Sequence, residues 1–316
     1  MKICVLDGYT LAPGDISWDP IRELGDVTIY DRSASDEILE RSRGCQALLT
    51  NKTPLDGETI RNLPGLKYIG VLATGYNLVD VETADKLGII VSNIPAYSTD
   101  SVAQMAFALL LAATNNVESY TRLNREGKWT ACEDFCYTVS PIMELAGKRM
   151  GIVGFGNIGQ KVAQIALVFG MNVTAFTSKD ASSLPQGVSK GDDAALGECD
   201  VVSLHCPLAE DTYHLVNREW LAKLKPGAIL INTARGQLVD EEAVCEALRS
   251  GRLRALCTDV LSQEPPSPDN PVLKAPNVYV TPHIGWASLE ARRRLMDIAA
   301  ENLKAFVEGH PRNVVK

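Results

Sequence analysis

The sequence lacks the features that mark several large classes of protein. Its 316 residues carry a net charge of −8, so there is no basic excess for nucleic acid or an anionic membrane surface. The longest apolar stretch, residues 105–113, is too short to cross a bilayer, and the first residues lack the apolar core and cleavage site of a secretory signal. These absences predict a cytoplasmic protein that has neither nucleic acid nor a membrane as its partner.

The eight cysteines do not form a disulfide or metal-site pattern. Cys132 and Cys136 are four residues apart, but no second pair of ligands lies near them in the sequence. Several other cysteines lie inside apolar, strand-like runs, as buried thiols do in a reducing compartment: Cys4, Cys45, Cys199, Cys206 and Cys257. We therefore expect neither a disulfide framework nor a bound metal.

The length and the apolar content suit two domains, because 46% of the 316 residues are hydrophobic. In the first hundred residues, short β-branched runs alternate with amphipathic helical stretches, and Gly or Pro breaks separate them. This alternation is typical of an α/β domain with a parallel sheet. The expected strands are residues 3–6, 27–30, 47–50, 68–72 and 89–91.

A long apolar helix is expected over residues 98–116, which begin with several N-cap candidates. Residues 126–141 are irregular and contain Trp129, Phe135 and Tyr137; aromatic side chains without periodicity predict packing against a second subunit. From Lys148 onward the alternation returns and predicts a second doubly wound sheet. Its expected strands are residues 149–153, 172–176, 201–205, 228–232, 255–258 and 278–280.

A glycine-rich turn follows the first strand of this second sheet. The turn reads Gly154-Phe155-Gly156-Asn157-Ile158-Gly159, and an apolar helical pattern comes after it. The three glycines suit a tight turn, close approach of the backbone to a pyrophosphate, and close helix–strand packing, while the helix N-terminus favours phosphate. Because a strand precedes the turn and another follows the helix at the usual spacing, we expect a dinucleotide to bind here.

The residues after the second strand bear on which dinucleotide binds. An NAD enzyme usually carries an acid there, which accepts hydrogen bonds from the ribose and repels a 2′-phosphate. Here the sequence reads Thr177-Ser178-Lys179, two hydroxyls and an ammonium that suit a 2′-phosphate. Alternatively, Lys179 is a solvated loop residue and the nearby Asp180 binds the ribose. We expect NADP or NAD, with NADP preferred.

Charged residues follow three later strands directly. Arg235 comes after residues 228–232, Asp259 and Glu264 come after 255–258, and His283 comes after 278–280. In an open parallel sheet, residues just past the carboxyl ends of the strands line the ligand crevice. Each residue alone could be an ordinary surface or turn residue, but four of them at strand ends in one nucleotide-binding domain predict a shared active site.

Motifs over nearly the whole chain resemble the D-isomer-specific 2-hydroxyacid dehydrogenase family, and most of all its glycerate dehydrogenase and hydroxypyruvate reductase members. They include ATGYNLVDVETADKLGI, NIPAYSTDSVAQMAFALLL, ELAGKRMGIVGFGNIG, INTARGQLVDEEAV and TPHIGWAS. The resemblance implies a homodimer in which a Rossmann coenzyme domain, residues 98–287, is inserted in a flavodoxin-like substrate domain, residues 1–97 and 288–316. The two crossings would form a hinge.

The resemblance also implies roles for the residues at the strand ends. Arg235 would bind the substrate carboxylate, and His283, paired with Glu264, would donate a proton to the substrate carbonyl oxygen, a task that histidine commonly performs near neutral pH. Backbone N–H groups of Thr74 and Gly75 would hold the carboxylate as well. Beyond the glycine turn, the cofactor would contact Thr177, Ser178, Lys179, Cys206, Pro207, Thr212, Thr233, Ala234, Arg235, Asp259 and His283.

Asn51 and Lys52 follow the third strand and could border the substrate pocket; a loop with a capping residue is an equal alternative. The implied reaction is the reduction of a small 2-keto acid, hydroxypyruvate and also glyoxylate, to the D-2-hydroxy acid. Phosphoglycerate, D-lactate and formate dehydrogenases are rivals within the class, although formate oxidation has no use for a proton donor to a carbonyl. A nucleotide-sensing corepressor with this fold is the rival from outside the enzymes.

Overall fold

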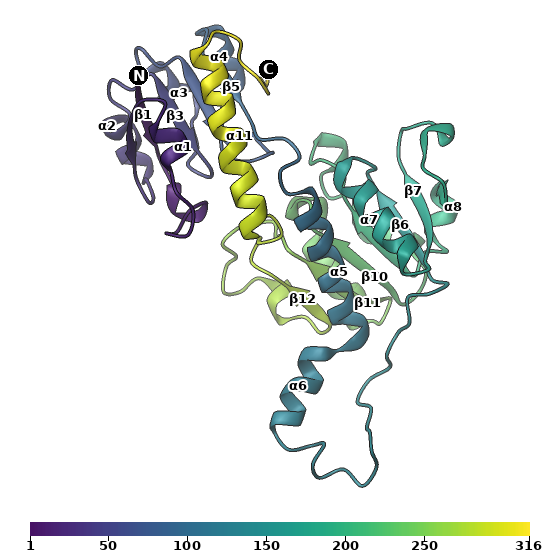
Figure 1. Cartoon of the computed structure of the whole chain (residues 1–316). Coiled ribbons are helices and arrows are strands. Elements are labelled where there is room, and N and C mark those ends of the chain that lie inside the picture. Colours follow the sequence, from purple (N-terminus) through teal and green to yellow (C-terminus); the bar gives the residue numbers. More distant parts are fainter. The chain divides into compact units, whose positions relative to one another are not determined.

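The computed structural model describes all residues, 1–316, and divides into two compact units. One unit comprises Met1–Ser98 and Trp286–Lys316, and the other comprises Thr99–Gly285. Each unit is built on one sheet flanked by helices (Figure 1). The sheets have five and seven strands, and every ladder pair in them is parallel. The predicted fold class, two doubly wound α/β domains, is confirmed.

The first unit has the strand order β2-β1-β3-β4-β5, which is the flavodoxin-like order. Its strands are short and mostly buried, as expected where helices cover both faces. The strands are β1 (Lys2–Val5), β2 (Asp26–Ile29), β3 (Ala47–Thr50), β4 (Tyr68–Val71) and β5 (Ile90–Ser92). The helices are α1 (Asp19–Arg22), α2 (Ile38–Arg41), α3 (Gly57–Arg61), α4 (Val81–Lys86) and α11 (Leu289–Val307).

Helix α11, drawn in yellow in Figure 1, packs against the sheet of this unit although it lies at the far end of the sequence. Its apolar face, which includes Leu295 and Leu303, is fully buried against residues of β1, β3 and β4. Arg292 of α11 donates to the Asp15 carboxylate at 2.8 and 2.6 Å and to the Leu11 carbonyl at 2.9 Å. These bonds hold the pKa of Asp15 below its usual range and fix the loop after β1 to the last helix.

The second unit has the strand order β12-β11-β10-β9-β6-β7-β8, the Rossmann order with one strand added at the β12 edge. Its strands are β6 (Arg149–Val153), β7 (Asn172–Phe176), β8 (Val188–Lys190), β9 (Val201–Leu204), β10 (Ala228–Asn232), β11 (Leu253–Thr258) and β12 (Val278–Val280). Its helices are α5 (Thr99–Asn115), α6 (Val117–Arg125), α7 (Asn157–Val168), α8 (Asp193–Leu196), α9 (Arg218–Lys223) and α10 (Glu241–Arg249).

The edge strand β8 is a difference from the six strands expected in this half. Its three residues, Val188-Ser189-Lys190, contain a single apolar side chain, and Ser189 and Lys190 are exposed. An edge strand that buries almost nothing has no hydrophobic pattern to predict it from. It pairs with β7, where Lys190 lies opposite Ala175.

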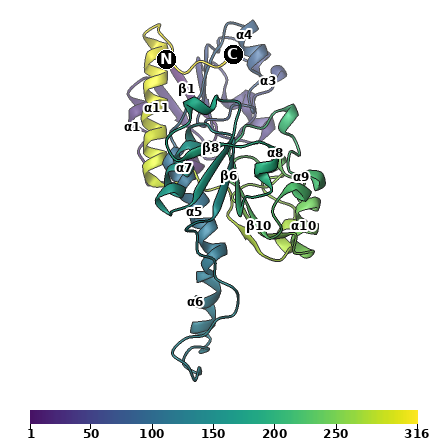
Figure 2. The ribbon, with the colours of Figure 1, turned by 90° about the vertical axis from the view of Figure 1, so that its right-hand side faces the viewer.

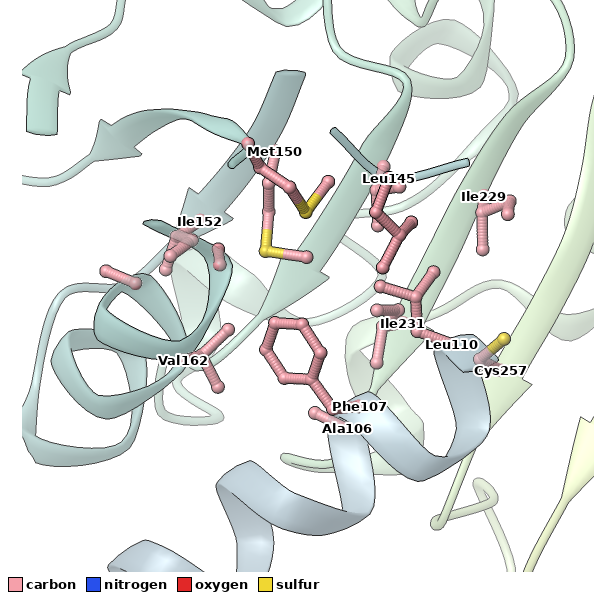
Figure 3. Close-up of a cluster of buried hydrophobic side chains, with 14 of the residues drawn as sticks. Ala106, Phe107, Leu110, Leu145, Met150, Ile152, Val162, Ile229, Ile231 and Cys257 are labelled. Carbon is pink, nitrogen blue, oxygen red and sulfur yellow. The ribbon is translucent and has the colours of Figure 1, made fainter. Parts of the chain in front are cut away.

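The core of the second unit lies between α5, α7 and the centre of the sheet. Figure 3 shows the Phe107 ring of α5 between Val162 of α7 and Ile231 of β10. Phe107 is 5% exposed, and Val162 and Ile231 are fully buried. The long apolar stretch after residue 98 is therefore a core helix, as its composition predicts. No helix of the structure is long and apolar enough to span a membrane.

Helix α6 and the loop that follows it project away from the sheet of the second unit, as two perpendicular views show (Figures 1 and 2). The turn to α6 occurs at Asn116, which has φ +52° and so ends α5. The loop is closed by a 2.9 Å hydrogen bond from the Trp129 indole N–H to the Phe135 carbonyl. Trp129 and Phe135 are nonetheless 54% and 89% exposed.

Candidate active site

The glycine turn between β6 and α7 has three glycines with three different surroundings. A Cβ on Gly154, which has φ +89°, would lie 2.4 Å from the Cys206 backbone nitrogen. A Cβ on Gly159 would lie 2.3 Å from the Gly154 carbonyl oxygen, whereas a Cβ on Gly156 would meet no atom within 4 Å. The first and third glycines are therefore required by the packing of the chain itself, and the second leaves free space in front of the turn.

A pocket of about 520 Å³ opens at this turn. Strand β6 lies between β9 and β7 in the sheet, so the turn forms the middle of the pocket and the loops after β9 and β7 form its two walls. The predicted residues that line it are Gly154, Gly156, Thr177, Ser178, Lys179, Cys206, Pro207 and Thr212. Asn157, Ile158 and Gly159 form the first turn of α7, and Asp180 is not part of the lining.

The pocket fits a dinucleotide phosphate. Gly156 is the N-cap of α7, and no side chain caps this helix, so its first N–H groups face the open space before Gly156. On the β7 wall, the Lys179 ammonium lies 5.9 Å from the centre of the Phe155 ring, over the glycine turn. The free helix terminus and this ammonium both favour an anion.

The lining also includes residues that sequence reasoning missed: Phe155, Phe176, His205, Asp211 and Leu215, together with Val153 and Ala209. Burial lowers the pKa of His205 to about 4, so its ring is neutral, and its Nε2 lies 2.8 Å from the Ser203 hydroxyl. His205 directly precedes Cys206, and the position of the predicted Cys206 was the only signal that could have found it.

The four charged residues predicted to share the active site, the catalytic Arg235, Glu264 and His283 and the cofactor-binding Asp259, follow three neighbouring strands, β10, β11 and β12. In the ladder Asn232 lies opposite Thr258, and Thr258 lies opposite Val280, so the strands end nearly level. The loops that follow them therefore begin at one edge of the sheet.

The structure brings Glu264 and His283 together. The His283 Nδ1 lies 2.5 Å from one Glu264 carboxylate oxygen, and the other oxygen accepts a 3.0 Å hydrogen bond from the Leu261 backbone N–H. The His283 side chain is 26% exposed and the Glu264 side chain is 36% exposed. A carboxylate at Nδ1 fixes the orientation of the ring and leaves Nε2 for a proton transfer.

Asp259 holds the loop that carries His283. Its carboxylate, in a residue only 2% exposed, accepts hydrogen bonds from the Thr281 hydroxyl at 2.5 Å and from the Ile284 and Gly285 N–H groups at 2.9 and 2.7 Å. The His283 N–H donates to the Asp259 carbonyl at 2.8 Å. His283 itself adopts φ +54°, a backbone conformation that needs such support.

Arg235 lies on the loop after β10, which is pressed against the loop after β11. A Cβ on the next residue, Gly236, would lie 1.9 Å from the Leu261 carbonyl carbon. Asn232 fixes this loop by accepting from the Ala234 N–H at 3.0 Å and donating to the Arg235 carbonyl at 2.8 Å. The Arg235 side chain is exposed, so its guanidinium is accessible to a ligand.

Thr233 and Ala234 occupy the bend between β10 and Arg235. The Thr233 hydroxyl is buried without a hydrogen-bond partner, which is an unusual state for a polar atom. Ala234 is half-buried, and its carbonyl accepts a 2.7 Å bond from the Arg235 guanidinium.

The predicted substrate-binding residues of the first unit lie at the carboxyl edge of its sheet. Asp7, after β1, accepts hydrogen bonds from the backbone N–H groups of Asn51, Lys52 and Thr53 at 2.8, 2.5 and 2.8 Å. Asn51 is 2% exposed and donates to the Leu72 carbonyl at 2.7 Å, just before Ala73. Asn51 therefore fixes the loop after β3 to the residues that follow β4.

Thr74 is hydrogen-bonded to the two residues that follow β5. The Thr74 hydroxyl donates to the Ile94 carbonyl at 2.8 Å, and the Asn93 amide donates to the Thr74 carbonyl at 2.7 Å. Thr74 is exposed and Gly75 is partly exposed. The Thr74 hydroxyl is therefore engaged within the unit, and the backbone N–H groups are what this loop can present to a ligand.

Comparison with known proteins relates this geometry to a family. The family model described as "D-isomer specific 2-hydroxyacid dehydrogenase, NAD binding domain" matches residues 107–285. A hydroxypyruvate reductase from Blautia hydrogenotrophica is 45% identical, with 100% of this chain and 99% of that protein covered. A glycerate dehydrogenase from Methylorubrum extorquens is 41% identical, with 89% of this chain and 88% of that protein covered.

Among solved structures, an acyclic imino acid reductase in complex with NADPH and D-Arg superimposes with a TM-score of 0.88. It is 31% identical, and the match covers 100% of both chains. The family resemblance of the sequence motifs is thus confirmed across the whole chain. With a Rossmann unit that matches the NAD-binding model and relatives that are dehydrogenases, the chain belongs to the D-isomer-specific 2-hydroxyacid dehydrogenases.

Proposed function

We propose that this dehydrogenase reduces hydroxypyruvate, and also glyoxylate, to the D-2-hydroxy acid, with His283 as the proton donor and with NADPH used at least as well as NADH. The observation that carries the proposal is the 2.5 Å contact between the Glu264 carboxylate and the His283 Nδ1 at the edge of the nucleotide-binding sheet. The names of the relatives, hydroxypyruvate reductase and glycerate dehydrogenase, support the choice of substrate.

The chain's own groups suit the reduction of a 2-keto acid. When a reduced nicotinamide cofactor is bound, it supplies the hydride for the carbonyl carbon. His283 gives a proton from Nε2 to the carbonyl oxygen, and the Glu264 carboxylate at Nδ1 fixes the orientation of the ring. Arg235 offers an exposed fork of donors to the substrate carboxylate. In the first unit, Thr74 and Gly75 offer backbone N–H groups that suit a carboxylate.

The cofactor contacts follow from the pocket in the second unit. Its glycine turn and α7 terminus would hold the pyrophosphate, and Thr177, Ser178 and Lys179 would face the adenosine ribose. No carboxylate stands on that wall, so nothing there repels a 2′-phosphate. The Thr233–Ala234 bend would border the nicotinamide end, in keeping with the unpartnered Thr233 hydroxyl, and Asp259 would act there by holding the His283 loop.

A panel of 2-keto acids assayed with NADH and NADPH side by side tests this proposal. We expect hydroxypyruvate to have the highest kcat/KM, glyoxylate to follow, and pyruvate and 3-phosphohydroxypyruvate to be poor. A maximum for pyruvate or for the phosphorylated acid would instead assign the chain to the D-lactate or phosphoglycerate branch. Negligible turnover of the whole panel together with specific peptide binding would favour a corepressor-like protein.

We further propose a homodimer in which the projecting segment of α6 and residues 126–141 contacts the second copy. The exposed Trp129 and Phe135 support it, because a hydrogen bond joins them on one projecting loop and exposed apolar side chains that gather on a surface mark an interaction site. Sedimentation at micromolar concentration tests it, and a monomer there would contradict it.

Eight free cysteines, five of them buried, support a reducing compartment, the cytoplasm.

A further inference from the structure

We propose that Lys190, on the edge strand β8, determines cofactor specificity by completing a site for the 2′-phosphate of NADP with Thr177, Ser178 and Lys179. The inference rests on the proposed function, because it deepens the cofactor assignment made there. It concerns a residue on a strand that has no hydrophobic signature and that lies outside the glycine turn and the loop after β7.

Lys190 lies on the neighbouring strand and binds the loop that forms the β7 wall, although it is not itself among the residues that line the pocket. It lies opposite Ala175, one residue before β7 ends at Phe176. Its ammonium donates a 2.7 Å hydrogen bond to the Lys179 carbonyl, in the loop that lines the pocket. An ammonium has three donors, so two remain for a ligand beside this loop.

The loop itself gathers further anion-binding groups. The Lys179 backbone N–H lies 3.2 Å from the Thr177 hydroxyl oxygen, which folds the residues Thr177-Ser178-Lys179 into a tight turn. The Lys179 ammonium lies 5.9 Å from the centre of the Phe155 ring of the glycine turn. The lining therefore carries one ammonium and two hydroxyls, and the Lys190 ammonium is bonded to the same loop from outside the lining, a donor set that suits a dianionic phosphate.

The acidic residues on either side of Lys179 and Lys190 in the sequence, Asp180 and Asp192, are not among the residues that line the pocket. Asp192, which follows β8, accepts a 3.0 Å hydrogen bond at the N-terminus of α8 and is thereby engaged as its cap. Asp180 follows the loop but does not line the pocket. Asp211 does line it, on the wall formed after β9, which lies on the other side of β6 from β7. The β7 wall is thus the cationic one.

The test is calorimetric titration of the purified protein with adenosine 2′,5′-bisphosphate and with 5′-AMP, two probes that differ by the 2′-phosphate. The variants are Lys190→Met, Lys190→Arg and, as the matched control, Lys223→Met. Lys223 is an exposed lysine of the same unit, 2.8 Å from Asp193 and outside the pocket lining. Thermal unfolding of each variant checks that the fold is retained.

We expect the wild type to bind the bisphosphate more tightly than 5′-AMP. Lys190→Met should weaken the bisphosphate about tenfold and leave 5′-AMP within about twofold, since one charge-assisted bond is lost. Lys190→Arg should restore most of the affinity, and Lys223→Met should behave as the wild type.

Equal weakening of both probes by Lys190→Met would mean that Lys190 only supports the loop, and it would overturn the inference. Unchanged binding of the bisphosphate would overturn it as well, while the proposed use of NADPH would stand. If the wild type binds the two probes equally, the cofactor proposal itself fails and the role of Lys190 fails with it.

Discussion

In the seven-stranded sheet, the loops of one half border an open pocket, whereas the loops of the other half are fixed by hydrogen bonds to a buried carboxylate. The cofactor half, β9, β6, β7 and β8 with their loops, borders an open pocket of about 520 Å³ whose β7 wall carries exposed side chains. In the catalytic half, β10, β11 and β12 with their loops, the buried Asp259 carboxylate accepts three hydrogen bonds from the loop that carries His283. A cofactor must enter and leave, whereas a proton donor must stay in place. Substitutions should therefore redistribute binding in the first half and lower turnover in the second.

Replacing the proposed proton donor should lower turnover more than any other of these substitutions. We expect His283→Ala to lower kcat about 10²–10⁴-fold, the scale of a general acid, and to leave cofactor binding nearly unchanged. Steady-state kinetics with hydroxypyruvate and a cofactor titration measure the two effects. His310→Ala is the control, because His310 is exposed and its ring lies against Glu308. Turnover of the His283 variant near that of the wild type would remove His283 from the mechanism.

The next test compares two buried aspartates that hold loops in the same way. Asp259 and Asp7 each accept three hydrogen bonds, from the His283 loop and from residues 51–53 respectively. An asparagine at either position sets an amide N–H₂ against N–H donors, so both variants should lose about 1–3 kcal/mol of unfolding free energy. Only Asp259→Asn should also lower kcat, by about 10–100-fold, because a small displacement of His283 is costly.

Denaturant unfolding and kinetics on both variants decide this comparison. Equal kcat for Asp259→Asn and the wild type, despite lost stability, would show that the position of His283 does not depend on the Asp259 carboxylate. A loss of kcat in Asp7→Asn as large as that in Asp259→Asn would mean that the effect is general destabilisation.

The sequence predicted the parts of this sheet that have local signatures. The glycine turn, the apolar strands and the charged residues just after them are read from short motifs, and the fold class follows from their alternation. Strand β8 was not predicted because it buries almost no apolar side chain. Helix α6 was not predicted because the left-handed backbone of Asn116, which separates it from α5, has no signature in the sequence pattern. The hydrogen bonds of Asp7 and Asp259 could not be predicted from local sequence patterns. Asp7 binds residues 44–46 positions away in the sequence, and Asp259 binds residues 22–26 positions away.

Two glycines of the turn in the cofactor half should differ in whether they serve cofactor binding or stability. Gly156 has φ −78° and open space around its would-be Cβ, so Gly156→Ala should keep the unfolding free energy within about 0.5 kcal/mol of the wild type. The added methyl would occupy the space before the turn, so the Kd of NAD⁺ and NADP⁺ should rise roughly tenfold. Gly159→Ala is the matched opposite: its Cβ would lie 2.3 Å from the Gly154 carbonyl oxygen, and overpacking should cost about 1–3 kcal/mol of stability.

Fluorescence titration and denaturant unfolding separate the two glycine variants. A Gly156→Ala protein that binds both cofactors as the wild type does would show that the free space is not where the pyrophosphate lies. A Gly159→Ala protein of unchanged stability would show that the start of α7 can move away from β6.

The smallest expected effect is a change of preference on the β7 wall. Thr177→Asp places a carboxylate where an NAD enzyme carries one, so it should accept hydrogen bonds from the ribose and repel a 2′-phosphate. Because Lys179 is exposed, part of its attraction to that phosphate is screened, and we expect the NADPH:NADH ratio of kcat/KM to fall only roughly three- to tenfold. Thr177→Asn, which has the same shape without the charge, is the control and should move the ratio less. If the wild type already prefers NADH strongly, the cofactor proposal is wrong; the ribose would then belong to Asp180, which would have to turn into a pocket that it does not line.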